Sequence, residues 1–320
     1  MSEDDHAEAG APGAASAAPG GRLPVDVTDP GSLAERLAQV GYLADPGLAT
    51  AAYLTCVLRR PLLLEGDAGV GKTATAAALA AVLQAPLLRL QCYEGIDAAQ
   101  ALYDWNFPAQ ILHLRAAEAA GGRRDEHVLE GELYDRRFLV ARPLLQALET
   151  DPVVLLIDEV DRADDEFEAL LLEVLSDFTI SVPELGTIRA ATPPVVVLTS
   201  NRTREVHDAL KRRCYYHWLD HPGFAREVEI VRTRLPGVSE RLAREVVSAV
   251  QNLRGQDLLK VPGVAETLDW TQALVALGAD HLDADLAVAT LGSVLKFRED
   301  QERARALDVA GLVARAVAGD

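Results

Sequence analysis

Eight consecutive residues have the types and spacing needed to hold a chain of phosphates. They are Gly66, Asp67, Ala68, Gly69, Val70, Gly71, Lys72 and Thr73, which together match the pattern G-x-x-x-x-G-K-[ST]. Small residues let the backbone curl around phosphate oxygens with its N–H groups pointing inward. Lys72 has the reach to contact the β- and γ-phosphates, and the Thr73 hydroxyl is a ligand for Mg²⁺. A glycine-rich turn that only joins a strand to a helix is the alternative, but the intact Gly-Lys-Thr favours binding of ATP with Mg²⁺.

An acidic pair further along the chain has the chemistry to complete such a site. Asp158 and Glu159 directly follow residues 153–157, an apolar run that predicts a buried strand. If this strand lies beside the strand that precedes the phosphate loop, Asp158 holds Mg²⁺ and Glu159 polarises the attacking water. The alternative is an acidic turn that caps the next helix, which an intact phosphate loop upstream makes less favoured.

The elements that must position these residues alternate between strand and helix. Apolar runs predict five strands, at 62–64, 86–91, 153–157, 194–198 and 214–219. Helical patterns lie between them, and this alternation predicts an α/β fold. Only helical patterns follow from residue 221 to residue 320, so we place a domain boundary near residue 220.

Three segments depart from this alternation. Residues 1–31 are rich in Ala, Gly, Pro, Ser and acids and lack apolar periodicity, which predicts a disordered tail. Ordered structure is expected to begin at Ser32, a candidate helix N-cap. Residues 97–140 make the connection between strands two and three long enough to contain an insertion, and residues 178–190 predict a β-hairpin.

The composition limits the compartment and the partners. The 320 residues include 31 Lys and Arg and 49 Asp and Glu, so the net charge is −18. That balance disfavours general affinity for nucleic acids or anionic membranes. Cys56, Cys92 and Cys214 are far apart and odd in number, so we expect reduced, packed thiols. No apolar run reaches membrane-spanning length and the acidic N-terminus is unlike a signal peptide, which predicts a cytoplasmic protein.

These features resemble the AAA+ ATPases, and within them the MoxR-type group. The phosphate loop and the acidic strand end are shared with many P-loop proteins, whereas the order of the insertion, the hairpin and the later polar residues is more specific. The runs LLIDEVDRADDEFEALLLEVLSDFTISVPELGTI and VVLTSNRTREVHDALKRRCYYHW look most similar to the MoxR-type ATPases associated with carbon monoxide dehydrogenase maturation. The resemblance covers about residues 32–320. It implies an α/β/α core with a five-stranded parallel sheet at 32–220 and an all-helical lid at 221–320.

The resemblance also implies roles for single residues. Asn201 matches the sensor-one position, where it holds the lytic water together with Glu159, and a helix cap is the alternative. Arg213 matches the arginine finger that acts on the nucleotide of a neighbouring subunit, with Arg212 as the second candidate. A surface ion pair is the alternative for this basic cluster.

Three further assignments stay open. Our alignment places Gln272 where the family's lid carries a sensor-two arginine, so either the lid senses nucleotide weakly or Lys296 or Arg298 substitutes. Tyr42, with the leucine after it, is equally suited to cover an adenine ring or to pack in the core. Arg162 either faces a subunit interface or pairs with an acid at the start of the next helix.

The combined features favour an ATP-hydrolysing chaperone that remodels a protein client. By resemblance it forms a homo-oligomeric ring, most simply a hexamer, and assists assembly of a metalloenzyme centre such as that of carbon monoxide dehydrogenase. A von Willebrand factor A-domain protein is the partner that the resemblance implies. Two alternatives stay open. A nucleic-acid loader of the same fold is disfavoured by the acidic balance, and a low-turnover ATP-binding switch is disfavoured by the presence of both Glu159 and Arg213.

Overall fold

A computed structural model describes residues 23–119 and 131–306 of the chain. Its centre is a five-stranded sheet made of β1 (Leu62–Gly66), β2 (Leu87–Gln91), β5 (Val154–Asp158), β8 (Val195–Ser200) and β9 (Tyr215–Leu219). The strand order is β2-β5-β8-β1-β9, and all neighbouring strands are parallel. The predicted five-stranded parallel sheet is therefore confirmed.

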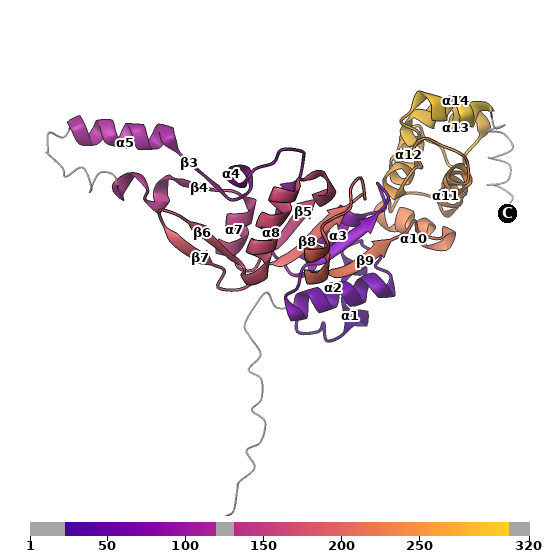
Figure 1. Ribbon diagram of the computed structural model, residues 1–320. Coiled ribbons are helices and arrows are strands. Elements are labelled where there is room, and N and C mark those ends of the chain that lie inside the picture. The colour runs from indigo at the N-terminus through magenta and orange to yellow at the C-terminus, as the bar shows by residue number, and fades with distance from the viewer. Residues whose placement is uncertain (1–22, 120–130, 307–320) are drawn as a thin grey trace, which may run out of the picture.

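Helices cover both faces of this sheet (Figure 1). One face packs against α1 (Pro30–Gln39), α2 (Pro46–Leu58) and α3 (Lys72–Val82), and the other against α7 (Pro143–Glu149), α8 (Asp165–Asp177) and α9 (Asp208–Arg213). Successive strand residues alternate between these two cores, as a strand's geometry requires. In β1, Leu62 and Leu64 join the first core and Leu63 joins the second. The result is the α/β/α sandwich expected from the sequence.

The start of the ordered chain differs from the sequence prediction. Residues 1–22 lie outside the described part, but residues 23–31 are described, and Val27 is buried. Asp29, and not Ser32, is the N-cap of α1: its side chain accepts from the Ser32 backbone N–H, while the Ser32 hydroxyl accepts from that of Asp29. Ser32 is thus the third helical residue of a reciprocal capping box, with Pro30 at the first position, where its missing N–H costs nothing.

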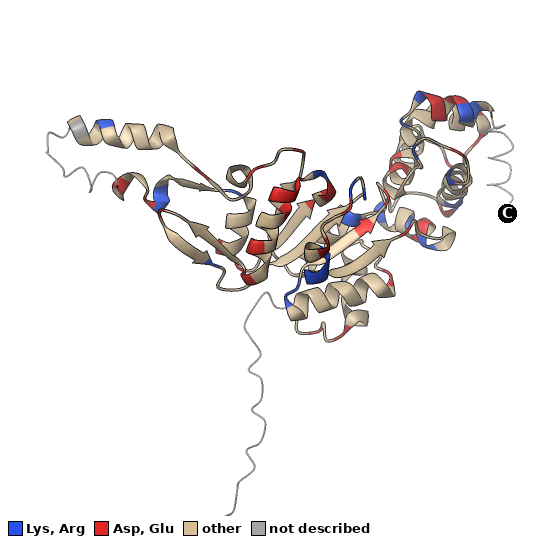
Figure 2. Ribbon diagram, viewed as in Figure 1, with Lys and Arg blue, Asp and Glu red and all other residues tan. Residues whose placement is uncertain are grey.

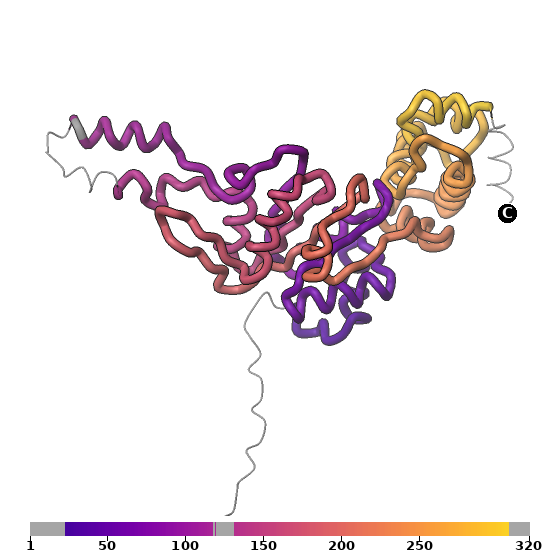
Figure 3. The backbone as a smooth tube through the Cα atoms, in the orientation of Figure 1, coloured from indigo at the N-terminus to yellow at the C-terminus, as the bar shows by residue number. Residues whose placement is uncertain are grey.

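The connection between β2 and β5 contains the expected insertion. It comprises α4 (Ala98–Ala101), β3 (Tyr103–Trp105), α5 (Phe107–Ala119), η1 (Arg136–Phe138) and β4 (Leu139–Ala141). β3 and β4 form an antiparallel ribbon, and α5 extends this arm away from the sheet (Figures 1 and 3). Residues 120–130 of the expected insertion lie outside the described residues. The expected hairpin is present as β6 (Thr179–Val182) and β7 (Gly186–Arg189).

A separate helical unit follows β9 at the end of the molecule opposite the arm (Figure 1). Its helices are α10 (Phe224–Arg234), α11 (Glu240–Arg254), α12 (Val264–Ala276), α13 (Ala284–Val294) and α14 (Arg298–Ala306). The last four enclose a core around Trp270, which is 2% exposed, and α10 packs against α11 through Val228 and Val231. Within the described ranges, no helix is long and apolar enough to cross a lipid bilayer. The three cysteines are free and buried.

Candidate nucleotide-binding site

The predicted phosphate loop connects β1 to α3, and its glycines are required by the geometry. Gly71 has a φ of 104° and caps the N-terminus of α3. This is a left-handed conformation that residues with a Cβ rarely adopt. A Cβ on Gly66 would lie 2.3 Å from the carbonyl oxygen of Leu219, at the end of β9. The loop is therefore held by the strand beside it, with the first amides of α3 facing the space where phosphates bind.

Lys72 lies inside this loop. Its Nζ donates to the carbonyl oxygens of Gly66 and Asp67, both at 2.7 Å, and the residue is only 6% exposed. Burial lowers the pKa of Lys72, and the carboxylates of Asp161 and Asp67 oppose that shift. The ammonium is thus held at the point from which it reaches a bound phosphate chain.

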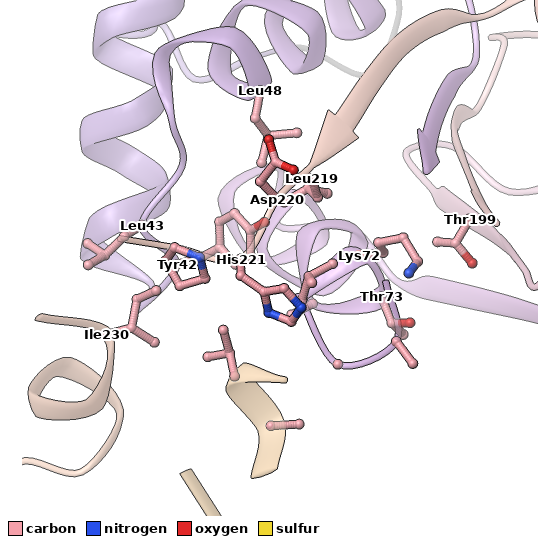
Figure 4. A pocket seen from close by; sticks show the side chains of 18 of the residues that line it. Tyr42, Leu43, Leu48, Lys72, Thr73, Thr199, Leu219, Asp220, His221 and Ile230 are labelled. Carbon is pink, nitrogen blue, oxygen red and sulfur yellow. The ribbon is translucent and has the colours of Figure 1, made fainter. Parts of the chain in front are cut away.

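A cavity of about 730 Å³ opens beside the loop. Its polar end contains Thr73, Asp158, Glu159 and Asn201, and its apolar end is lined by Leu43, Ile230 and Leu268. In Figure 4, Lys72, Thr73 and Thr199 lie on one side, with Tyr42, Leu43 and Ile230 on the other. Small-molecule sites typically have this size and this combination of apolar walls with a few placed polar groups. The polar end of the cavity therefore lies at the phosphate loop, and Ile230 of α10 belongs to its apolar end.

Thr73 and Asp158 meet at the polar end, as the sequence predicted. The Thr73 hydroxyl donates to Asp158 Oδ1 at 3.2 Å, and the Thr199 hydroxyl donates to the same oxygen at 2.5 Å. Asp158 is 3% exposed. Hydroxyl and carboxylate oxygens are the ligands that Mg²⁺ prefers, so this pair of side chains fits the metal that accompanies a nucleotide triphosphate.

Glu159 follows directly and presents its carboxylate to the same space. Its backbone has a φ of 56°, and its N–H donates to the Thr199 hydroxyl at 2.9 Å. The carboxylate accepts from Gln91 Nε2 and Arg162 Nη1, each at 3.0 Å, while Asn201 Nδ2 lies 3.5 Å from Oε1. Two residues predicted as catalytic, Glu159 and Asn201, are therefore close enough to contact one water molecule. Within this chain Arg162 pairs with Glu159 and not with an acid at the start of α8, and because its side chain is exposed, its role at a subunit interface stays a prediction.

Asp161 is a site residue that the sequence reasoning missed. It is 2% exposed and accepts from the backbone N–H of Asn201 at 3.2 Å and of Thr203 at 2.8 Å. The Thr203 hydroxyl also donates to it at 2.7 Å. Asp161 thereby fixes the loop that carries Asn201. The sequence offered one signal for this role, a third acid three residues after Asp158. A single acid is enough to cap a helix, so the additional acid pointed to another function.

Arg89 and Gln91 were also missed. Both lie on β2, which pairs with β5 in a register that sets Gln91 opposite Asp158. Arg89 forms an ion pair with Asp158 at 2.5 Å, and Gln91 donates to Glu159 as described above. The available signal was the alternation LLRLQ, in which two polar residues share one face of an otherwise apolar strand.

Tyr42 packs against the core and also borders the cavity, so its contact with a base stays a prediction. Its ring lines the cavity, while its hydroxyl lies 2.7 Å from Thr75 Oγ1 on α3. Burial raises the pKa of Tyr42 to about 12, so the phenol stays neutral. Leu43 beside it also lines the cavity, and its carbonyl accepts from Arg226 of α10 at 2.8 Å.

The lid meets the phosphate loop through the first turn of α12, and this changes the interpretation of Gln272. Ala265 N–H donates to the Gly69 carbonyl at 3.3 Å, and a Cβ on Gly263 would lie 2.8 Å from the Ala68 carbonyl. Val264, Ala265 and Leu268 line the cavity. Gln272 does not: it is exposed, one turn beyond Leu268, so placing it at the γ-phosphate was wrong for this arrangement.

The two proposed substitutes for Gln272 lie elsewhere as well. Lys296 donates to the Ser293 carbonyl at the end of α13, and Arg298 pairs with Glu302. Neither lines the cavity. The lid cations that do, among the residues described, are Arg226 and Arg234 of α10.

The two finger candidates lie outside the cavity of their own chain. Arg213 is exposed, and its Nη1 donates to the Leu172 carbonyl at 2.7 Å. The Arg212 side chain is 83% exposed and lies 4.0 Å from Asp208. Figure 2 shows the basic end of α9 as a blue cluster near the acidic surface of α8. Neither arginine lines the cavity, so any action on a nucleotide needs another chain's site.

Comparison with known proteins agrees with this geometry. Residues 61–214 match the family model described as AAA domain (dynein-related subfamily). With its five-stranded parallel sheet, phosphate loop and acidic strand end, the chain has the AAA+ fold.

The solved structures that resemble the chain are remote. One is a RuvB mutant from Thermotoga maritima, with 19% identity over 77% of this chain and 67% of that chain, at a TM-score of 0.46. Another is the T. maritima RuvB Holliday junction branch migration motor, with 18% identity over 80% and 68%, at a TM-score of 0.43. No curated protein matches the sequence. Likeness at this level does not bear on what the chain acts on.

Proposed function

We propose that this chain hydrolyses ATP with Mg²⁺ and uses the reaction to remodel a protein client, as MoxR-type AAA+ chaperones do. The observation that carries the proposal is the convergence of Lys72, Asp158, Glu159 and Asn201 around one cavity. Binding alone needs the phosphate loop, whereas a carboxylate and an amide aimed at the same point are suited to orient a water molecule.

Each residue has a role that its position supports. Lys72 and the loop amides bind the β- and γ-phosphates, while Thr73 and Asp158 hold Mg²⁺, which neutralises phosphate charge. Glu159 takes the proton from the attacking water, and Asn201 orients that water. Tyr42 and the apolar end of the cavity cover the base.

The site is completed in a homo-oligomeric ring, for which a hexamer is the expectation from the family resemblance. Arg213 lies on the surface and away from its own cavity, which supports its action on a neighbour's nucleotide. The same resemblance suggests the client and the partner: a metalloenzyme such as carbon monoxide dehydrogenase under assembly, and a von Willebrand factor A-domain protein.

Two variants test the proposal. Lys72→Ala removes the charge that faces phosphate, so ATP affinity falls at least about tenfold. Glu159→Gln keeps ATP affinity and abolishes turnover, because the carboxylate acts on water. Glu173→Gln, an exposed acid on α8, is the charge-matched control and retains both properties. Equal loss of binding in the Lys72 and Glu159 variants contradicts these roles.

The Glu159→Gln variant also tests the client. A chain that binds ATP without turnover retains its partners, so affinity purification from the native host is followed by identification of bound proteins. Recovery of a metalloenzyme or its maturation factors supports the client assignment. Recovery of nucleic acid with loading or recombination proteins instead favours the nucleic-acid alternative.

A further inference from the structure

Arg89 is a further cation that lines the cavity of the proposed site, and the ATPase roles assigned above do not use it. It is exposed on one side and lines the cavity, although it comes from β2 and not from the phosphate loop. We propose that Arg89 is a positioning residue that neutralises Asp158 before Mg²⁺ arrives, so that the chain binds a nucleotide triphosphate without the metal. This inference rests on the ATP–Mg²⁺ site proposed above.

The geometry divides the two oxygens of Asp158 between two kinds of donor. Oδ1 is the nearer acceptor for the hydroxyls of Thr73 and Thr199, which face the metal position, and the Thr73 hydroxyl lies 3.5 Å from Oδ2. Oδ2 accepts Nε and Nη2 of Arg89, at 3.0 and 2.5 Å. A guanidinium bonded in this way fixes the plane of the carboxylate as well as its charge. Arg89 therefore holds Asp158 in the orientation in which Oδ1 meets Thr73.

The surrounding charges explain why such a cation is needed. Asp158, Glu159 and Asp161 place three carboxylates within four residues, and Asp158 and Asp161 are almost fully buried. A triphosphate approaching the loop brings further negative charge, and like charges in a partly buried site repel strongly. Arg162 bonds to Glu159 and Lys72 is held within the loop, so Arg89 is the cation in direct contact with Asp158.

Arg89 and Mg²⁺ consequently neutralise the same carboxylate. When Mg²⁺ is bound, it supplies the positive charge at Asp158 and Arg89 contributes little extra. In the absence of metal, Arg89 is the cation that bonds directly to that carboxylate, with Lys72 acting only through space, and loss of Arg89 leaves a buried carboxylate without its ion-pair partner beside the phosphates. Linkage is reciprocal, so a variant whose ATP affinity depends more on Mg²⁺ must also gain a larger factor in Mg²⁺ affinity when ATP binds.

The test is ATP affinity, measured by isothermal titration calorimetry in EDTA and in saturating Mg²⁺. Arg89→Gln is expected to weaken ATP binding by about tenfold or more in EDTA and by less than about threefold in Mg²⁺. The ATP affinity of Arg89→Lys is expected to lie between that of Arg89→Gln and that of the unchanged chain. Arg162→Gln is the matched control, since it removes a nearby charge that contacts Glu159 and not Asp158. It should change affinity by a similar factor in both conditions. Circular dichroism confirms that each variant is folded.

Two results overturn the inference. One is an equal loss of ATP affinity in EDTA and in Mg²⁺ for Arg89→Gln, which means that Arg89 only supports the fold. The other is an unchanged chain that binds ATP in Mg²⁺ but not in EDTA. Failure of the proposed function looks different, because the unchanged chain then binds ATP in neither condition.

Discussion

The side-chain amide of Asn201 lies 3.5 Å from the carboxylate of Glu159, although 42 positions separate the two residues in the chain. Pairing of β5 with β8 brings them together: Ile157 is opposite Leu198 in the register, so both strands end at the same edge of the sheet. Asp161 then fixes the backbone of Asn201. Sheet topology, and not local sequence, thus places the acid and the amide around one water position.

Asn201→Ala tests this relationship. We expect turnover to fall by about 10- to 100-fold, because the attacking water loses its orientation, with ATP affinity changed less than about threefold. Stopped-flow phosphate release and calorimetry measure the two quantities. Asn252→Ala in α11 removes an amide that bonds only to the Ser248 carbonyl, and it should leave turnover unchanged. A loss of affinity as large as the loss of turnover would show that Asn201 supports binding and not the reaction.

The lid depends on a buried ion pair whose breakage should be costly. Glu227 is fully buried, and its carboxylate accepts hydrogen bonds from Arg254 Nη1 and Nη2 at 2.6 and 2.7 Å. Arg254 Nε donates to the Pro262 carbonyl. Arg254→Met leaves the Glu227 charge unpaired, so the free energy of unfolding should fall by about 3–5 kcal/mol.

Urea unfolding followed by circular dichroism measures this change. Adding Glu227→Gln to Arg254→Met should recover part of the loss, because no charge is then left unpaired. Arg298→Met is the control: it breaks an exposed pair with Glu302 and should cost less than about 1 kcal/mol. An Arg254 variant as stable as this control would contradict the account of the lid.

His221 gives the protein a defined pH dependence. It lies between β9 and α10, and its Nε2 is 3.4 Å from Asp67 Oδ2, although neither ring nitrogen makes a well-formed hydrogen bond. Burial, followed by the nearby Arg254 guanidinium, lowers the pKa of His221 below its ordinary value of 6.5. The unfolded chain therefore takes up this proton first, and folding stability falls as the pH drops below about 6.5.

Comparison with His221→Asn isolates this contribution. The free energy of unfolding is compared for the unchanged chain and the variant between pH 8 and pH 5. Their difference should stay constant from pH 8 down to about pH 6.5, and below that pH the unchanged chain should lose stability relative to the variant. Urea unfolding at each pH provides the measurement. A relative gain in the stability of the unchanged chain on acidification would mean that the pKa of His221 is raised in the fold.

The parts of the site that local sequence encodes were predictable. The phosphate loop and the Asp158-Glu159 pair are contiguous patterns, and each follows an apolar run that forms a strand. Asn201 was found because it ends another such run. Arg89 and Gln91 required knowledge that β2 lies beside β5, which no local pattern contains.

The errors also have physical reasons. Ser32 was chosen as a helix cap on residue type, but the reciprocal bonds with Asp29 make it the third helical residue. Gln272 was placed by aligning a segment along α12, where a shift of one turn moves a side chain from the cavity to the surface. The contacts of Gly263 and Ala265 with the phosphate loop show which turn of α12 meets the site.

The central claim, hydrolysis at a site completed by a neighbouring chain, is tested most directly by mixing two inactive variants. Arg213→Ala lacks the finger and Glu159→Gln lacks the catalytic carboxylate, so each alone should bind ATP and turn over at about 10⁻³ of the normal rate or less. In mixed rings, some interfaces join an intact Glu159 to an intact Arg213.

The measurement is phosphate release from an equimolar mixture, with mass photometry to establish that the two variants assemble together. The account predicts that the mixture recovers a substantial part of the normal rate, at least about tenfold above either variant alone, because a finger supplied in trans contributes about 10³-fold or more. The same experiment with Arg212→Ala in place of Arg213→Ala identifies which of the two arginines acts on the neighbouring site. If the mixtures assemble into rings and neither arginine variant gives more activity with Glu159→Gln than its components do alone, the shared site is contradicted.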